Sequence, residues 1–133
     1  MRPEHGNRLA PDAPALADDA AAWRGAYVHI PFCHRVCPYC DFAVVAGHED
    51  LVGRYQAAVT AEIEAAVPFD GPLQAVHFGG GTPSRLPAQA LAGMLGALRA
   101  RFGLVPAAEV SLEANPEDWT PQVADAGLQG AAY

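Results

Sequence analysis

The sequence predicts an α/β fold built on a parallel sheet. Three short runs rich in β-branched, aromatic and other apolar residues alternate with two longer runs in which apolar residues recur at three- and four-residue steps. Strand–helix repeats of this kind build a parallel sheet with right-handed crossovers. Polar, glycine and cysteine residues directly follow the strands, and βα folds place their active sites at the carboxyl ends of strands. We therefore expect one site at that edge.

The first half of the chain predicts a strand, a helix and a second strand. Residues 26–32 form the first predicted strand, which Pro31 and a cysteine-rich loop bring to an end. Residues 49–67 predict a helix with four apolar positions on one face: Val52, Tyr55, Val59 and Ile63. Residues 73–78 then predict a short, buried strand.

The second half repeats the pattern. Residues 87–102 predict a helix that has proline in its first turn, Gly103 just past its end and four apolar residues on its inner face: Leu91, Met94, Leu95 and Leu98. Residues 109–114 predict a third strand. Thr120 and Pro121 have the residue types of a helix cap and first helical position, so a third helix should begin there.

The three cysteines of the chain are Cys33, Cys37 and Cys40, in a C-x3-C-x2-C spacing. Disulfides between residues so close in sequence would be strained. A structural zinc site needs four ligands, for which His29 or His34 could supply the fourth. Three thiolates on a [4Fe–4S] cluster would instead leave one iron free to bind another molecule. Spacing alone leaves the iron–sulfur and zinc interpretations open and favours the first.

Four segments together carry a family resemblance. They are the run from Tyr27 to Cys33, the cysteine loop, residues 77–84 (HFGGGTPS) and residues 111–116 (SLEANP). In this order they closely resemble the radical S-adenosylmethionine (SAM) enzymes of the oxygen-independent coproporphyrinogen III oxidase family. The resemblance implies that the cysteines hold a [4Fe–4S] cluster chelated by SAM. It also implies that the fold is the N-terminal half of a partial (β/α)6 barrel, about three of its six βα units.

The end of the cysteine loop indicates a branch of this family. Coproporphyrinogen dehydrogenases carry a fourth cysteine two residues after the third, whereas Cys40 is followed by Asp41 and Phe42. That ending resembles the HemW branch of haem chaperones. The resemblance therefore implies a HemW-like protein that binds haem and passes it to an acceptor protein. The alternatives are an oxygen-independent coproporphyrinogen III oxidase of porphyrin biosynthesis and a zinc-stapled, non-enzymatic βα domain.

The resemblance also assigns SAM contacts. Six residues match positions of the family near the cluster or SAM: Tyr27, Tyr39, Gly80, Gly81, Thr82 and Glu113. Glycines let the backbone approach a ligand closely, and the family uses this loop for the methionine amino group. Tyr39 would contact adenine, and Glu113 would accept the ribose hydroxyls. The implied chemistry is reductive cleavage of SAM to methionine and a 5′-deoxyadenosyl radical, with an electron donor such as flavodoxin or ferredoxin.

Composition narrows the partners and the compartment. The net charge is −7, and the eight basic residues form no stripe, which argues against nucleic acid or an anionic membrane as partner.

Residues 1–22 lack the apolar region of a signal peptide, and we expect them to be a disordered leader before a truncated core domain at 23–133. No apolar run approaches the roughly 18 residues of a membrane span. Reduced cysteines fit the cytoplasm. In a truncated barrel, the third strand should be an exposed edge.

Overall fold

A four-stranded parallel sheet forms the centre of the computed structural model, which describes residues 23–118, 120–125 and 130–132. The strand order is β1-β4-β5-β6, with bounds Gly25–Ile30, Leu73–Gly80, Leu104–Glu113 and Gly130–Ala132. A separate two-residue parallel pair joins β2 (Phe32–Cys33) to β3 (Val45–Ala46) beside the end of β1. The predicted parallel α/β fold is confirmed.

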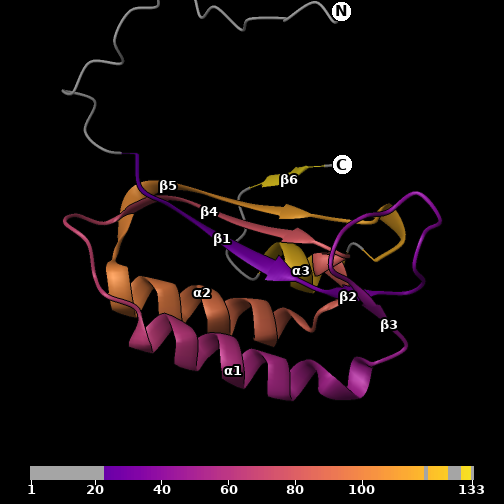
Figure 1. Cartoon of the computed structure of the whole chain (residues 1–133). Coiled ribbons are helices and arrows are strands. Elements are labelled where there is room, and N and C mark those ends of the chain that lie inside the picture. The colour runs from indigo at the N-terminus through magenta and orange to yellow at the C-terminus, as the bar shows by residue number, and fades with distance from the viewer. Residues whose placement is uncertain (1–22, 119, 126–129, 133) are drawn as a thin grey trace, which may run out of the picture.

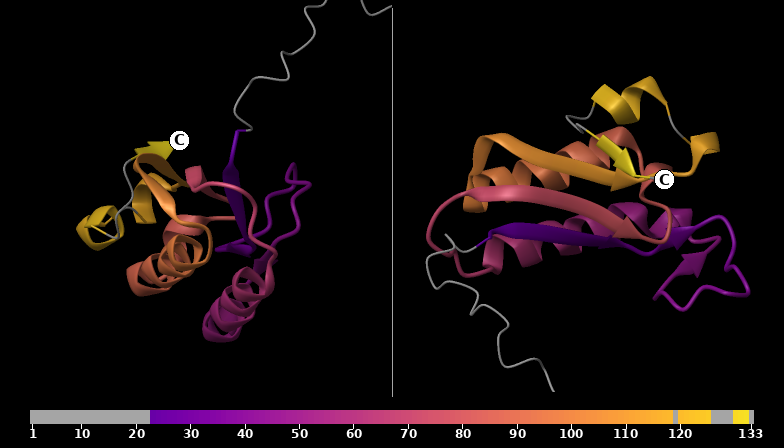
Figure 2. Two further views of the ribbon diagram at one scale, coloured as in Figure 1. Left: turned by 90° about the vertical axis from the view of Figure 1, so that its left-hand side faces the viewer. Right: turned by 90° about the horizontal axis from the view of Figure 1, so that it is seen from above.

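The two long helices cover the same face of the sheet (Figures 1 and 2). These are α1 (Val52–Ala65) and α2 (Ala88–Phe102). Alternate strand residues point toward them and are buried: Val28, Ile30, Val76, Phe78, Val110 and Leu112. All four predicted inner residues of α2 are buried against these strands, and α1 adds Ile63. The opposite face of the sheet therefore carries the polar members of the same strands.

Local sequence signals set most of the helix boundaries. The predicted helix at 49–67 forms as a 3-10 turn, Glu49–Leu51, followed by α1. Pro87 lies just before α2, and Gly103 follows α2 with a φ of 74°, a conformation that glycine adopts without strain. The third helix, α3 (Pro121–Asp125), begins where expected, and the backbone N–H of Val123 donates to Thr120 Oγ1 at 3.3 Å.

Two predicted strand boundaries and one prediction about the edge were wrong. The third strand, predicted at 109–114, begins five residues earlier and runs as β5 from Leu104 to Glu113. The first strand breaks at Pro31 into β1 and β2, because the chain turns there to begin the cysteine loop. The third strand is not left as an edge, since β6 pairs with its carboxyl end from Ser111 to Glu113. Among the described strands the outer ones are β1 and β6. The predicted leader at residues 1–22 lies outside the described residues. Within the described ranges, no helix is long and apolar enough to cross a membrane.

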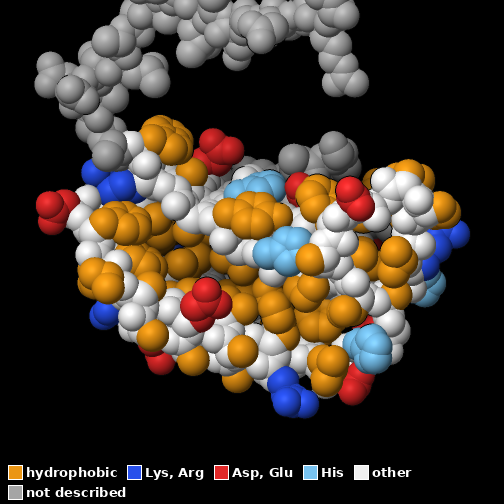
Figure 3. Space-filling view, viewed as in Figure 1, with side chains coloured by type: hydrophobic (Ala, Val, Ile, Leu, Met, Phe, Trp, Pro, Cys, Tyr) orange, Lys and Arg blue, Asp and Glu red, His pale blue; other side chains and the backbone are white. Residues whose placement is uncertain are grey.

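A hollow of about 380 Å³ lies between β1 and the two helices, and apolar side chains dominate this face of the molecule (Figure 3). Tyr55 lines it and donates its hydroxyl hydrogen to the carbonyl oxygen of His29, which joins α1 to the edge strand. Burial, followed by the negative charge of Glu62, raises the pKa of Tyr55 to about 12. The phenol therefore keeps its proton in the folded protein at pH values where the unfolded chain loses it.

We expect Tyr55→Phe to reduce the loss of stability at alkaline pH. An unfolded tyrosine releases its proton near pH 10, so the unfolded chain binds fewer protons than the folded one between about pH 10 and 12. The contribution from Tyr55 is fully present below pH 10 and is lost as the pH rises through that window. Urea unfolding at pH 9 and pH 11 measures the difference. An equal loss of stability in the wild type and in Tyr55→Phe would contradict this account.

Candidate functional site

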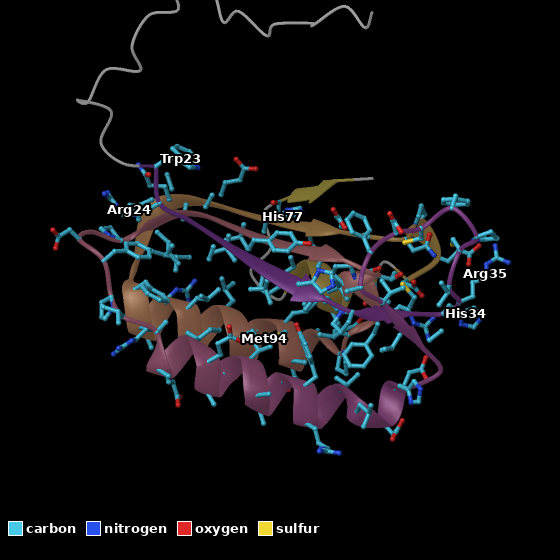
Figure 4. The ribbon with its side chains drawn as sticks, viewed as in Figure 1. Trp23, Arg24, His34, Arg35, His77 and Met94 are labelled. Carbon is cyan, nitrogen blue, oxygen red and sulfur yellow. The ribbon has the colours of Figure 1, made fainter. Side chains whose placement is uncertain are left out.

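The carboxyl ends of β1 and β4 border a hollow of about 800 Å³. It brings together most of the residues singled out in the sequence: Cys33, Cys37, Tyr39, Cys40, Gly80, Gly81 and Thr82. Arg85 and three residues that follow β5 also line it: Asn115, Glu117 and Asp118. Figure 4 shows the labelled His34 and Arg35 at this end of the molecule, in the loop that carries the cysteines. Tyr27 and Glu113 are not among the lining residues.

The three cysteines are free thiols, and each is partly buried. A tight turn places Cys37 and Cys40 together, because the N–H of Cys40 donates to the carbonyl of Cys37 at 3.0 Å. In the part of the chain that the structure describes, no three Cys, His, Asp or Glu side chains are already arranged to hold a metal ion. Three thiols facing one hollow, with no disulfide between them, nevertheless have the chemistry that an iron–sulfur cluster needs.

The two histidines that could complete a zinc site have other contacts. His29 Nε2 lies 2.8 Å from the carbonyl oxygen of Ala43, and its Nδ1 lies 3.4 Å from the Tyr27 hydroxyl. His34 Nδ1 lies 3.2 Å from Nη1 of Arg85, a cation that disfavours a metal ion beside it. A tetrahedral zinc site would need one of these rings as its fourth ligand, in addition to the contacts that the ring already makes. An iron–sulfur cluster chelated by another molecule needs the three thiols alone, and the donor set fits that cluster better.

The glycine loop packs directly on the start of the cysteine loop. The N–H of Gly81 donates to Ile30 O at 2.7 Å, and the N–H of Thr82 donates to Phe32 O at 2.8 Å. A Cβ at Gly81 would lie 2.8 Å from Phe32 O and 2.9 Å from Cys33 Sγ, so no other residue fits without a shift. Thr82 Oγ1 lies 3.7 Å from the same sulfur. Glycine is thus needed here for the contact between the two loops.

Gly80 is constrained by its conformation as well as by its neighbours. Its φ is +111°, and a Cβ there would lie 2.7 Å from the imidazole of His29. A side chain at this position would therefore collide with β1. The N–H of Gly80 donates to Glu113 Oε2 at 3.0 Å, which ties the glycine loop to the end of β5.

Glu113 and Tyr27 lie on the open face of the sheet, and Glu113 contacts Gly80, which lines the hollow. The Glu113 side chain is 44% exposed, so its carboxylate is accessible although one oxygen accepts the Gly80 N–H. The Tyr27 ring stacks on His77 at a centroid distance of 5.8 Å. Partial burial, and then the charge of Glu113, raise the pKa of Tyr27. The two predicted residues are therefore electrostatically coupled neighbours.

Tyr39 is the most exposed of the predicted contacts, at 88%. The neighbouring Cys37 side chain, first as a hydrogen-bond partner and then by its charge once it is ionised, raises the pKa of Tyr39. Val36 and Phe42 are exposed in the same loop, at 56% and 62%. The loop thus presents apolar and aromatic surface beside the three thiols.

Sequence reasoning missed Arg85, which lines the hollow and joins three segments. Its Nη2 donates to Glu49 Oε1 at 2.9 Å, and its Nη1 faces His34 in the cysteine loop. The pKa of Glu49 is lowered, first by a hydrogen bond between its carboxylate and its own backbone and then by the hydrogen bond from Arg85. The contacts span 36 and 51 residues of sequence, so no local pattern could have predicted them.

Comparison with known proteins identifies what this arrangement is similar to. The model of the radical SAM superfamily matches residues 27–128. A haem chaperone HemW from Synechocystis sp. is 46% identical over an alignment of 97 positions, gaps included, which covers 68% of this chain and 24% of that protein. HemW from Mycobacterium tuberculosis is 42% identical over an alignment of 133 positions, gaps included, which covers 95% of this chain and 34% of that protein.

A solved structure supports the same relationship. Coproporphyrinogen III oxidase (HemN) from Escherichia coli, a radical SAM enzyme, superposes with a TM-score of 0.69 at 25% identity. The match covers 80% of this chain and 26% of that one. The chain therefore spans about a quarter to a third of the length of these relatives.

Proposed function

Because the chain belongs to the radical SAM superfamily, we propose that it forms the cluster-binding part of a HemW-like haem chaperone. Both relatives described above carry the HemW name, and the loop ends in Cys40-Asp41-Phe42 without a fourth cysteine. The observation that carries the proposal is the hollow at the strand ends, which three free thiols and the glycine loop share.

Each residue has a distinct part in this proposal. Cys33, Cys37 and Cys40 would hold the [4Fe–4S] cluster, and Gly80, Gly81 and Thr82 would bind the methionine end of SAM. Tyr39 would contact adenine, Glu113 the ribose hydroxyls, and Tyr27 the region between cluster and SAM. When bound, the cluster supplies one electron for cleavage of the sulfonium C–S bond. The chain's own residues orient SAM and limit the access of water.

The proposal extends to partners that lie beyond these residues. A HemW-like protein would bind haem and pass it to an acceptor protein, and a cluster of this class would need a one-electron donor such as flavodoxin or ferredoxin. We propose the cytoplasm as the location, since the thiols must stay reduced to bind iron.

An oxygen-independent coproporphyrinogen III oxidase is the second candidate, favoured by the structural similarity to HemN. Anaerobic incubation of the cluster-loaded chain with haem, and separately with coproporphyrinogen III in the presence of SAM and a one-electron reductant, distinguishes the two. A chaperone should retain haem in a stable complex and leave coproporphyrinogen unchanged. Formation of protoporphyrinogen without stable haem binding would favour the oxidase and contradict the chaperone proposal.

We expect Glu113→Ala to weaken SAM binding and to leave the cluster in place. The variant removes the acceptor for the ribose hydroxyls, and the loss of such hydrogen bonds should raise the SAM dissociation constant by roughly tenfold or more. Titration of SAM onto cluster-loaded protein measures the constant, and iron analysis checks the cluster.

Glu109→Ala is the matched control, because Glu109 is an exposed carboxylate on the same strand and is not among the residues that line the hollow. It should bind SAM as the wild type does. Equal SAM affinities for Glu113→Ala, Glu109→Ala and the wild type would show that Glu113 is not a SAM contact.

A further inference from the structure

The open face of the sheet carries a row of three side chains on adjacent strands. Tyr27 on β1 is in register with His77 on β4, and His77 is in register with Ser111 on β5. Glu113 lies two residues after Ser111 and therefore on the same face of β5. Figure 4 shows His77 on the opposite side of the sheet from Met94, which is buried in α2. The row is thus outside the hydrophobic core and next to the proposed site.

Gly79 has no side chain, and this leaves room for the rings of Tyr27 and His77 above it. A Cβ at Gly79 would lie 2.8 Å from Cε2 of Tyr27 and 3.0 Å from Nε2 of His77. Both rings therefore occupy the volume that a side chain at Gly79 would fill. This placement brings His77 Nε2 to 3.5 Å from Glu113 Oε1.

The hydrogen bonds fix the direction in which protons are donated. A carboxylate only accepts, so the contact with Glu113 requires a proton on His77 Nε2. His77 Nδ1 lies 2.8 Å from Ser111 Oγ, and the serine hydroxyl can donate to it. The result is a chain from Ser111 through His77 to one oxygen of Glu113, while the Gly80 N–H donates to the other oxygen at 3.0 Å.

We propose that His77 is a positioning residue that orients the Glu113 carboxylate toward the vicinal diol of a bound nucleoside. The inference rests on the proposed function, in which that diol is the SAM ribose. Two donors, one on each oxygen, restrict rotation of the carboxylate and leave its remaining lone pairs for the ligand hydroxyls. Ser111 acts through His77 by holding its ring in one tautomer and orientation.

Another role for His77 would be packing alone, since its ring stacks on Tyr27 with an interplanar angle of 28°. Two substitutions separate the roles. In His77→Gln the side-chain amide nitrogen can occupy the place of Nε2 and still donate to Glu113. In His77→Asn the shorter side chain reaches only the place of Nδ1. Both lose the stacked ring, so a difference between them reports the contact with Glu113.

The test measures SAM affinity by titration on cluster-loaded protein, with iron content and melting temperature recorded for each variant. We expect His77→Gln to stay within about twofold of the wild type and His77→Asn to bind SAM roughly threefold to tenfold more weakly, the range for one lost hydrogen bond. Ser111→Ala should shift affinity in the same direction by a smaller factor. In a Glu113→Ala background, His77→Asn should add no further loss.

The outcomes distinguish this inference from the proposed function. Equal affinities for His77→Gln and His77→Asn, or a full additional loss in the Glu113→Ala background, would overturn the positioning role. Should His77→Asn fail to fold, Ser111→Ala still tests the role, alone and combined with Glu113→Ala, where it should add no further loss. An unchanged affinity in Glu113→Ala alone would overturn the proposed SAM site itself, and the positioning role with it.

Discussion

Cys37→Ser is expected to yield protein with little iron after anaerobic reconstitution. Cys37 is one of three thiols that line the hollow, and a serine hydroxyl is a poor ligand for iron–sulfur clusters. With one of three thiolates lost, a second iron would lack a protein ligand. Iron and acid-labile sulfide per chain, measured beside the wild type, give the result directly.

His34→Gln is the control, because His34 lies between two of the proposed ligands and is exposed to solvent. The variant should keep the cluster. If His34→Gln lost its metal as completely as Cys37→Ser, a site of three cysteines and one histidine would replace the iron–sulfur assignment. Full cluster content in Cys37→Ser would remove the proposed ligand set.

Gly81→Ala should lower the free energy of unfolding by about 1–3 kcal/mol, the usual cost of forcing an extra methyl group into packed structure. Two of the three nearest atoms are backbone carbonyl oxygens, of Phe32 and Ile30, which cannot rotate away. The third is Cys33 Sγ, so the substitution should also weaken retention of the cluster. Urea unfolding and the rate of iron loss to a chelator measure the two effects.

Gly96→Ala provides a matched control in the same chain. Gly96 lies within α2, and a Cβ there meets nothing within 4 Å. The substitution should raise the free energy of unfolding by roughly 0.5–1 kcal/mol, because alanine favours the helix. Equal stability changes for the two variants would show that the contact between the glycine loop and the cysteine loop is not tight.

The helices and the buried strands could be predicted because their signals are local. The apolar faces of α1 and α2 follow from residue spacing, and Gly103 and Thr120 mark helix ends by their own chemistry. The pairing of β5 with β6 could not be predicted in this way. β6 has the sequence Gly-Ala-Ala, which carries no strand signal, and its backbone pairs because the neighbouring strand offers free partners.

The candidate site divides along the same line. The sequence sufficed to predict that the cysteine loop and the glycine loop meet, because each directly follows a predicted strand of one parallel sheet. The contacts of Arg85 with His34 and Glu49 depend on which loops adjoin in space. The contact of His77 with Glu113 depends on the register of β4 and β5. A shift of one residue between these strands would move one of the two side chains to the other face of the sheet and abolish the contact.

Anaerobic reconstitution of the chain with iron and sulfide tests the central claim most directly. We expect about four iron and four sulfide per chain, and an electron paramagnetic resonance spectrum of the reduced protein that changes when SAM is added, since three thiolates leave one iron open to a ligand. A colourless protein that binds zinc in place of iron, or a cluster whose spectrum is indifferent to SAM, would contradict the account.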